Sequence, residues 1–200
     1  YPSRALPEFD HVYAKAFEAH DNFNDLRSVY ALVCDASTPV RMAAAQEMAG
    51  VVHPNLATLL GSGTVNCSHL GEARHVFFVE KPRAIRLSEV LKKQSRLHEH
   101  RVIDNILRPA ILALQLLRNK KVGYGHLHPH QLFMGDSLTL GECYSAPCSS
   151  LNHYLYEPLE RMMADPLGRG EATEKSDVYA LGILAFELIY GLDKFKTIPR

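Results

Sequence analysis

No glycine precedes Gly50 in this chain of 200 residues. A loop whose backbone amides wrap a triphosphate needs glycine, because glycine allows close approach of the backbone and positive φ. The chain also contains neither a G-x-S-x-G elbow nor an H-E-x-x-H helix, so hydrolase and metalloprotease activities have no support. We therefore do not expect the N-terminal part to hold nucleotide phosphates through a glycine-rich loop.

An excess of either charge is also absent. Lys and Arg total 22, as do Asp and Glu, and no basic run occurs, so we expect no nucleic-acid partner.

The cysteines show no CxxC spacing and the start of the chain has no signal-peptide pattern, which favours a reducing, cytoplasmic location. The most apolar segment, residues 178–189, is too short to span a bilayer and contains Glu187, so we expect no membrane segment in this chain.

The pattern of apolar residues predicts regular elements along most of the chain. A hydrophobic fraction of 46% is enough for one sizeable core or two small lobes. Pro109 lies inside a long helical pattern and is expected to kink that helix or to mark its true start. The predicted strands are residues 12–19, 28–34, 75–80 and 137–140, and the predicted helices are residues 40–49, 87–93, 99–119 and 176–191.

Four motifs occur in a fixed order and together resemble the protein kinase family. They are HPNLATLLGSG at residues 53–63, YGHLHPHQLF at 124–133, YEPLER at 156–161 and SDVYALGILAFELIYG at 176–191. The resemblance covers about residues 28–191. It implies an α+β, two-lobed kinase-like fold, with a small antiparallel β N-lobe carrying one helix at residues 1–81. A mainly helical C-lobe would occupy residues 82–200 and be truncated after its central helix.

The segment YGHLHPHQLF is similar to the kinase catalytic loop, H-R-D-L-K-P-E-N, but its chemical residues differ. The resemblance places Tyr124 at the histidine, Gly125 at the arginine, His126 at the aspartate, His128 at the lysine and Gln131 at the metal-binding asparagine. His126 has the chemistry of a general base, yet alone it does not hold a metal-nucleotide. We therefore expect a loop that keeps its course and has lost its catalytic set.

The residues that would bind a nucleotide look equally altered. Phosphoryl transfer in this family uses a strand lysine paired with a helix glutamate. The resemblance puts Val33 at the lysine position, or Cys34 if the register differs by one, and Ala44 at the glutamate position, with Glu47 about one turn further on. The vestigial pocket would consist of Val33, Ala44, the gatekeeper Val79, the hinge residue Glu80, Phe133, Gly141 and Glu142.

The segment GEC at residues 141–143 stands where the family has D-F-G. Gly141 then occupies the aspartate position and offers no side-chain oxygen. A register shifted by one makes Glu142 the metal ligand and places Tyr144 at the glycine position, where positive φ is unfavourable. Glu142, His126 and Lys15 are the residues on which any remaining activity would depend.

Other side chains have structural or metal-binding interpretations. Asp177 is expected to hold the backbone amides of the catalytic-like loop, although an acid here also suits a helix N-terminus. Glu160 is expected to close the activation-like segment, and Arg169 is a structural or partner-binding cation. Alternating histidines at 126, 128 and 130 could bind zinc with Cys143 or Cys148, but the spacing fits no known zinc motif, so no metal is expected.

These losses together predict a pseudokinase that acts by binding other proteins and uses no cofactor. The alternative is a divergent kinase-like phosphotransferase or nucleotide-binding switch that uses ATP and Mg²⁺. A third possibility is a structural domain of a larger chain.

Overall fold

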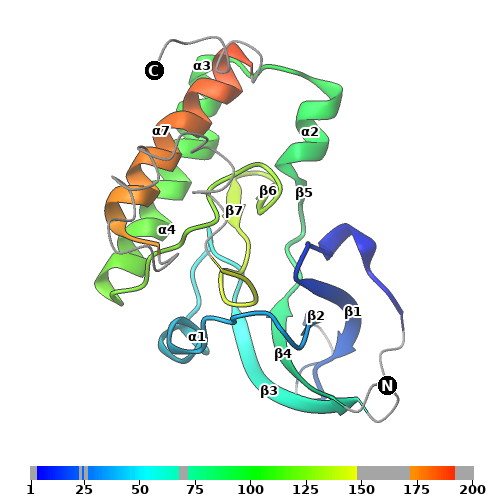
Figure 1. The fold of residues 1–200 in the computed structure, drawn as a ribbon. Helices are drawn as coiled ribbons and strands as arrows, with labels where there is room; N and C mark the ends of the chain where they lie inside the picture. The colour runs from blue at the N-terminus through cyan, green and yellow to red at the C-terminus, as the bar shows by residue number, and fades with distance from the viewer. Residues whose placement is uncertain (1–3, 23, 25–26, 68–71, 148–171, 192–200) are drawn as a thin grey trace. The chain divides into compact units, whose positions relative to one another are not determined.

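The computed structural model describes residues 4–22, 24, 27–67, 72–147 and 172–191. The chain forms two compact units. Unit 1 contains Tyr1–His53, Ala57–Lys81 and Glu142–Pro147, and unit 2 contains Pro54–Leu56, Pro82–Gly141 and Cys148–Arg200. Figure 1 shows the elements along the chain.

Unit 1 is built on a four-stranded antiparallel sheet in the order β1-β2-β4-β3. The strands are β1 (Ala14–His20), β2 (Ser28–Cys34), β3 (Leu59–Cys67) and β4 (Glu72–Glu80), and a short 3-10 helix, η1 (Pro7–Phe9), precedes β1. The pattern that predicted β4 began at residue 75, so the strand is longer than expected. Its early part pairs Glu72 with Cys67 of the preceding strand, and this strand pairing overrides the polar sequence.

Helix α1 (Met42–Met48) packs in unit 1 through Ala45 and Met48, which are buried. The predicted helix, residues 40–49, is longer at both ends. Arg41 leaves the helical conformation at φ −94° and ψ 68°, since its N–H donates to the Tyr144 carbonyl at 2.8 Å. At the other end, Gly50 has φ +72° and its N–H donates to the Leu59 carbonyl, which turns the chain into β3.

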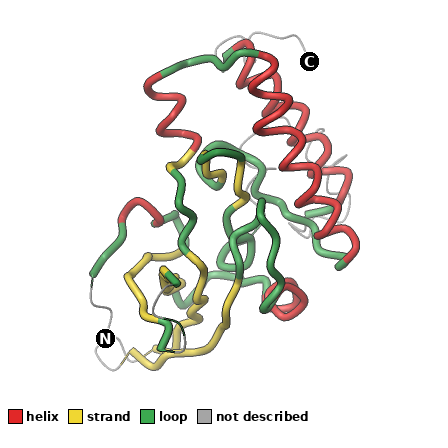
Figure 2. Tube along the Cα trace, turned by 180° about the vertical axis from the view of Figure 1, so that it is seen from behind, coloured by secondary structure: helices red, strands yellow, loops and turns green. Residues whose placement is uncertain are grey.

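Unit 2 combines a small sheet with helices. The strands β5 (Ile85–Arg86), β6 (Leu132–Met134) and β7 (Leu138–Leu140) form an antiparallel sheet, and α2 (Leu87–Lys93) follows β5 directly. Figure 2 shows the helices of this unit in red. The apolar pattern predicted only the region of β7, because β5 and β6 are too short to show alternation.

The helical stretch from residue 99 to 119 contains a change of helix type. It consists of α3 (Glu99–Val102), the π-helix η2 (Ile103–Leu107) and α4 (Arg108–Asn119). Pro109 lies in the first turn of α4, where its missing N–H does the least harm. The π-helical segment accommodates the proline that the sequence placed inside one long helix.

Helix α7 (Glu174–Tyr190) begins two residues before the predicted helix, because Thr173 caps it. The Thr173 side chain accepts from the Ser176 N–H at 3.1 Å, and the Ser176 hydroxyl accepts from the Thr173 N–H at 2.8 Å. This reciprocal capping box satisfies two N-terminal donors. Within the described residues, no helix has the length and hydrophobicity needed to cross a membrane.

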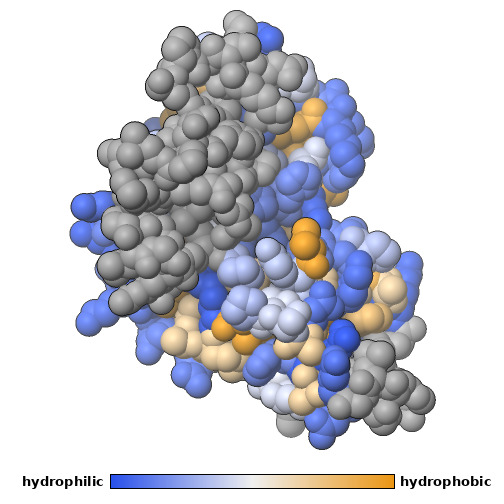
Figure 3. Space-filling model, viewed as in Figure 1, coloured by the Kyte–Doolittle hydropathy of each residue, from blue (hydrophilic) through white to orange (hydrophobic). Residues whose placement is uncertain are grey.

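The described part of the surface in Figure 3 is mostly hydrophilic, with single apolar residues among the polar ones. Exposed apolar residues of unit 1 include Val12 and Val52, and those of unit 2 include Leu112 and Val178. Isolated apolar residues on a surface are normal. The cores of the two units therefore hold most of the large apolar side chains.

Candidate functional site

The catalytic-like loop of unit 2 is held by one carboxylate. Asp177, in the first turn of α7 and 4% exposed, accepts hydrogen bonds from the N–H groups of Tyr124 at 2.7 Å and Gly125 at 2.8 Å. Gly125 has φ +75°, a conformation that favours glycine. The capping box of α7 fixes the helix turn that carries Asp177, so the helix positions the loop.

A second connection runs from the loop to the small sheet. The fully buried Tyr124 donates its hydroxyl hydrogen to the Gln131 carbonyl at 3.2 Å, and the Gly141 N–H donates to the same oxygen at 2.8 Å. Gln131 precedes β6, and Gly141 follows β7. Tyr124 and Gly141 therefore share one acceptor, the Gln131 carbonyl, which connects the loop to the sheet.

The space beside Gly141 is already occupied. A Cβ atom added to Gly141 would lie 2.8 Å from the Gln131 carbonyl oxygen, 3.1 Å from the Phe133 ring and 3.2 Å from Gln131 Oε1. The first of these contacts is with backbone, which does not move aside readily. Unit 2 therefore has no room for an aspartate side chain at this position without rearrangement.

The alternating histidines form a row within unit 2. The ring centroids of His126 and His128 are 6.4 Å apart, and those of His128 and His130 are 6.1 Å apart. His126 and His128 are buried, and burial, with the charges of Arg86 and Lys92, lowers the pKa of His130. Cys148, one of the expected zinc partners, lies outside the described residues, and the described residues contain no group of three possible metal ligands.

The Glu142 carboxylate is fully engaged inside unit 1. Its Oε2 accepts from the N–H groups of Tyr144 at 2.7 Å and Ser145 at 3.0 Å, and its Oε1 accepts from the Ser145 hydroxyl at 2.6 Å. His11 Nε2 lies 2.8 Å from the Ser145 hydroxyl oxygen and 3.6 Å from Glu142 Oε1. Glu142 is 3% exposed, so the side chain stabilises its own loop.

Of the two residues considered for the lysine position, Cys34 is the one that faces this loop. Cys34 is completely buried, and its sulfur lies 3.6 Å from the Ser145 carbonyl oxygen. Neighbouring residues of a strand point to opposite faces, so Val33 lies on the other face of β2. Burial, the nearby Glu142 and Asp35 raise the pKa of Cys34 to about 12, and the thiol carries no charge near neutral pH.

The other pocket residues predicted in unit 1 are placed as follows. Ala44 is half-buried on α1, Glu47 is exposed, and Arg41 at the start of the helix donates from Nη1 to the Cys143 carbonyl at 2.8 Å. Val79 is fully buried on β4. Lys15, considered as a phosphate ligand, pairs with Asp10 at 2.9 Å with a largely exposed side chain.

The backbone donors of the predicted hinge are also used. The Glu80 N–H donates to the Thr58 carbonyl at 2.9 Å and the Lys81 N–H to the Ser28 carbonyl at 2.8 Å. The next residue, Pro82, has no N–H. Glu160, Arg169 and the remainder of the YEPLER motif lie outside the described residues.

Comparison with known proteins gives the fold. No protein-family model matches the chain. The chain is 23% identical over 156 residues to the serine/threonine-protein kinase PrkC of Bacillus subtilis (strain 168), a match that covers 74% of this chain and 23% of PrkC. Among solved structures, it is similar to the crystal structure of Rad53 1-466 in complex with AMP-PNP, with a TM-score of 0.69 and 11% identity. That match covers 94% of this chain and 47% of the Rad53 chain.

The chain has a protein kinase-like fold. It combines a small antiparallel sheet with a helical part, the α+β class expected from the sequence. The chain spans less than half of the Rad53 chain and under a quarter of PrkC.

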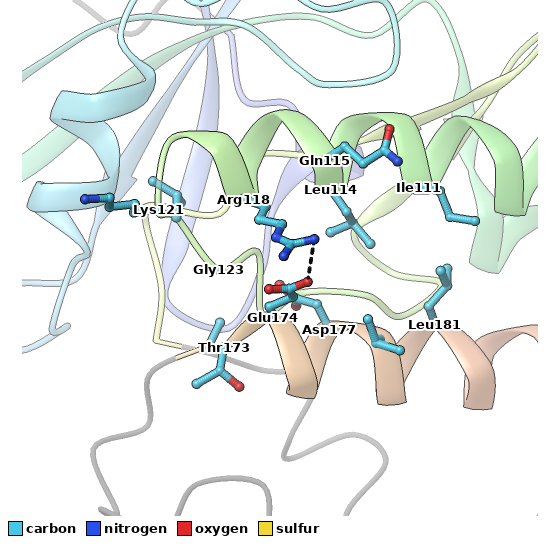
Figure 4. A pocket seen from close by; sticks show the side chains of 13 residues that line it. Ile111, Leu114, Gln115, Arg118, Lys121, Gly123, Thr173, Glu174, Asp177 and Leu181 are labelled. Carbon is cyan, nitrogen blue, oxygen red and sulfur yellow. Dashed lines mark ion pairs between the residues drawn. The ribbon is translucent and has the colours of Figure 1, made fainter.

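The kinase-like unit 2 also contains a cavity that sequence analysis did not identify. It has a volume of about 380 Å³ and lies between α4 and the first turns of α7. Figure 4 shows Leu114 and Leu181 on facing helices, with an ion pair of 3.1 Å between Arg118 and Glu174. Its lining residues are far apart in the sequence and only the fold brings them together, so no local motif could have signalled it.

Proposed function

We propose that this kinase-like chain is a pseudokinase, a domain without phosphotransferase activity that acts by binding other proteins. The observation that carries the proposal is the state of Glu142, the acidic side chain offered by the D-F-G-like segment. Both of its oxygens already accept hydrogen bonds from Tyr144 and Ser145. A divalent cation would have to compete with these hydrogen bonds for two oxygens of a side chain that is 3% exposed.

Two further features support the same conclusion. The space that a side chain at position 141 would need is filled by Gln131 and Phe133. The residue of β2 that faces the Glu142 loop is the neutral Cys34 rather than a lysine. Positioned cations and metal ligands supply most of the catalysis in phosphoryl transfer, so their loss removes the reaction rather than slowing it slightly.

The backbone of the predicted hinge supports the proposal that the chain binds no nucleotide cofactor. Glu80 and Lys81 use their N–H groups within unit 1, and Pro82 has none. None of these three consecutive residues therefore has a free backbone N–H to donate to a purine. Binding to other proteins, in the reducing cytoplasm that the cysteine pattern favours, is the role that we assign to the remaining scaffold.

The alternative is a divergent nucleotide-binding protein or weak kinase. Its support comes from the relatives, because PrkC is named a serine/threonine-protein kinase and the Rad53 structure is a complex with AMP-PNP. In that case ATP and Mg²⁺ would bind, and Glu142 with His126 would carry the remaining chemistry.

Thermal unfolding with ATP, alone and with Mg²⁺ or Mn²⁺, separates the two functions. A ligand that binds only the folded state raises the melting temperature, and the pseudokinase is expected to show no metal-dependent shift at millimolar nucleotide. The matched variant is Glu142→Gln, which keeps the size of the side chain and removes its charge. A metal-dependent shift in the wild type that Glu142→Gln abolishes, together with phosphate transfer to a generic protein substrate, would overturn the proposal.

A further inference from the structure

Strand β3 forms an open edge of the unit 1 sheet. The opposite edge, β1, is joined by the preceding segment, because Leu6 N–H donates to the Ala16 carbonyl and Glu18 N–H to the Arg4 carbonyl. On β3, the N–H of Gly50 reaches only the first residue, Leu59. Among the described residues, no backbone bond continues along the outer side of β3 beyond that point, and Figure 1 shows β3 at the end of the strand order.

The hydrogen bonds of β4 show which groups of β3 face outward. Lys81 N–H bonds to β2 at Ser28, and Glu80 N–H bonds to the β3 side at Thr58. Because successive residues alternate between the two neighbouring strands, the even-numbered residues of β4 bond to β3. Their partners beyond the bulge are Gly61, Gly63, Val65 and Cys67. The outward groups therefore belong to the three residues between these partners, Ser62, Thr64 and Asn66.

Beyond Gly61, the described residues give this edge none of the usual protection against pairing. Natural edge strands are commonly blocked by charged residues, proline, bulges or a covering segment. From Leu59 to Cys67 the sequence LLGSGTVNC has no charge and no proline, and residues 62–66 are all exposed. The one irregularity, between Leu59 and Gly61, lies at the start of the strand.

The segment is self-complementary in an antiparallel arrangement. A twofold axis at Thr64 pairs Thr64 with Thr64, Ser62 with Asn66, and Val65 with Gly63 of the second copy. Val65 is 46% exposed, and no atom lies within 4 Å of the position that a Cβ on Gly63 would take. The valine of one copy therefore fits over the glycine of the other, and no like charges meet.

We propose that β3 pairs with β3 of a second copy of this chain, centred on Thr64, to form one continuous eight-stranded sheet. The number of strands follows from two four-stranded sheets joined at one edge. The ladder is short, so its interface is small and the association is expected to be weak and concentration-dependent. The pairing does not depend on whether the chain binds nucleotide.

Sedimentation equilibrium over a dilution series into the millimolar range tests the pairing. The wild type is expected to double its mass at high concentration. Thr64→Pro removes an outward N–H without touching the bonds to β4 and is expected to stay monomeric. Thr64→Val keeps this N–H and should still dimerise. A wild type that stays monomeric at every concentration would overturn the proposal. The same result is expected if the β3 edge pairs with a different extended peptide.

A cysteine experiment tests the register and does not depend on the proline variant folding. Residues directly opposite in an antiparallel pair have Cβ atoms about 4.5–5.5 Å apart, within reach of a disulfide after small adjustment. Thr64→Cys is therefore expected to form a disulfide-linked dimer under mild oxidation. Val65→Cys, which faces Gly63 of the second copy, should not exceed the wild-type background. Equal crosslinking of the two variants, or a dimer unaffected by a folded Thr64→Pro, contradicts the pairing.

Discussion

Single residues in and beside the catalytic-like loop pack closely and form hydrogen bonds within unit 2. Tyr124 is fully buried and bonds to the Gln131 carbonyl, and Gly141 leaves room for Gln131 and Phe133. Each of these groups needs a partner or a defined space, because buried polar groups without partners are costly. The loop is therefore held by specific hydrogen bonds and close packing.

Replacing Asp177 should destabilise the chain strongly. Asp177→Ala leaves the buried N–H groups of Tyr124 and Gly125 without their acceptor, and each such loss costs about 1–3 kcal/mol. Asp177→Asn keeps one acceptor oxygen and should lose less. Urea unfolding followed by circular dichroism measures the free energies. Glu174→Gln, three residues earlier, is the control, because it removes an acid from the same helix turn and loses only an exposed ion pair with Arg118, worth about 0–1 kcal/mol. An Asp177→Ala variant as stable as this control would contradict the role of Asp177.

Adding a side chain at Gly141 should destabilise the fold. Gly141→Ala places its Cβ against the Gln131 carbonyl, and overpacking of this kind costs about 1–3 kcal/mol. Gly182→Ala is the matched control, because Gly182 lies inside α7 with open space around it and should gain up to about 1 kcal/mol in helix propensity. Thermal melts of both variants provide the measurement. A Gly141→Ala protein as stable as the wild type would show that the space beside residue 141 is not filled.

At the level of elements, capping and backbone pairing decide where each helix ends. Helix α1 is shorter than its Ala-rich sequence allows, because the Arg41 N–H bonds to Tyr144 outside the helix. Helix α7 is longer at its start because Thr173 and Ser176 cap each other. Helix propensity alone sets neither boundary. A hydrogen-bond partner for the backbone groups at a helix end shifts the residue at which the helix begins or ends.

The capping box of α7 gives a prediction at this scale. Thr173→Ala removes the acceptor for the Ser176 N–H and should lower the free energy of unfolding by about 0.5–2 kcal/mol. Thr173→Ser keeps the hydroxyl and should change it little. Because α7 carries Asp177, hydrogen exchange of the Tyr124 and Gly125 amides should also accelerate in Thr173→Ala. Unchanged exchange at these two amides would mean that the cap and the loop are not coupled.

For the molecule as a whole, two separate cores divide the expected site residues. Val33, Ala44, Val79, Glu80 and Glu142 lie in unit 1, and Tyr124, Gly125, His126, Gln131, Phe133, Gly141 and Asp177 lie in unit 2. Each group is embedded in the hydrogen bonds of its own unit. The contacts of these residues can therefore be tested by measuring the free energy of unfolding.

Global stability should fall at high pH through Cys34. Its pKa is raised in the folded state from 9.0 to about 12, so the unfolded chain loses its proton first. The stabilising contribution is complete below about pH 9 and is lost as the pH rises toward 12. Cys34→Ala should show a shallower decline in the free energy of unfolding over this range. Chemical unfolding at several pH values tests this, and equal slopes would refute it.

The sequence by itself determined the kinase-like class and several of the elements. Alternating apolar residues give the bounds of β2, and helical periodicity gives those of α2, both as predicted. The motif around Asp177 pointed to its contact with the loop amides. These signals are local, because the spacing of apolar residues is set by the period of the backbone.

Only the tertiary structure decided how the residues of the candidate site are arranged. The spacing of residues left Val33 and Cys34 open, and strand pairing showed that Cys34 faces the Glu142 loop. Glu142 could be a metal ligand by sequence, yet its Oε2 accepts hydrogen bonds from the amides of Tyr144 and Ser145, and its Oε1 accepts from the Ser145 hydroxyl. The filled space beside Gly141 and the open edge of β3 arise from long-range packing, which no local pattern encodes.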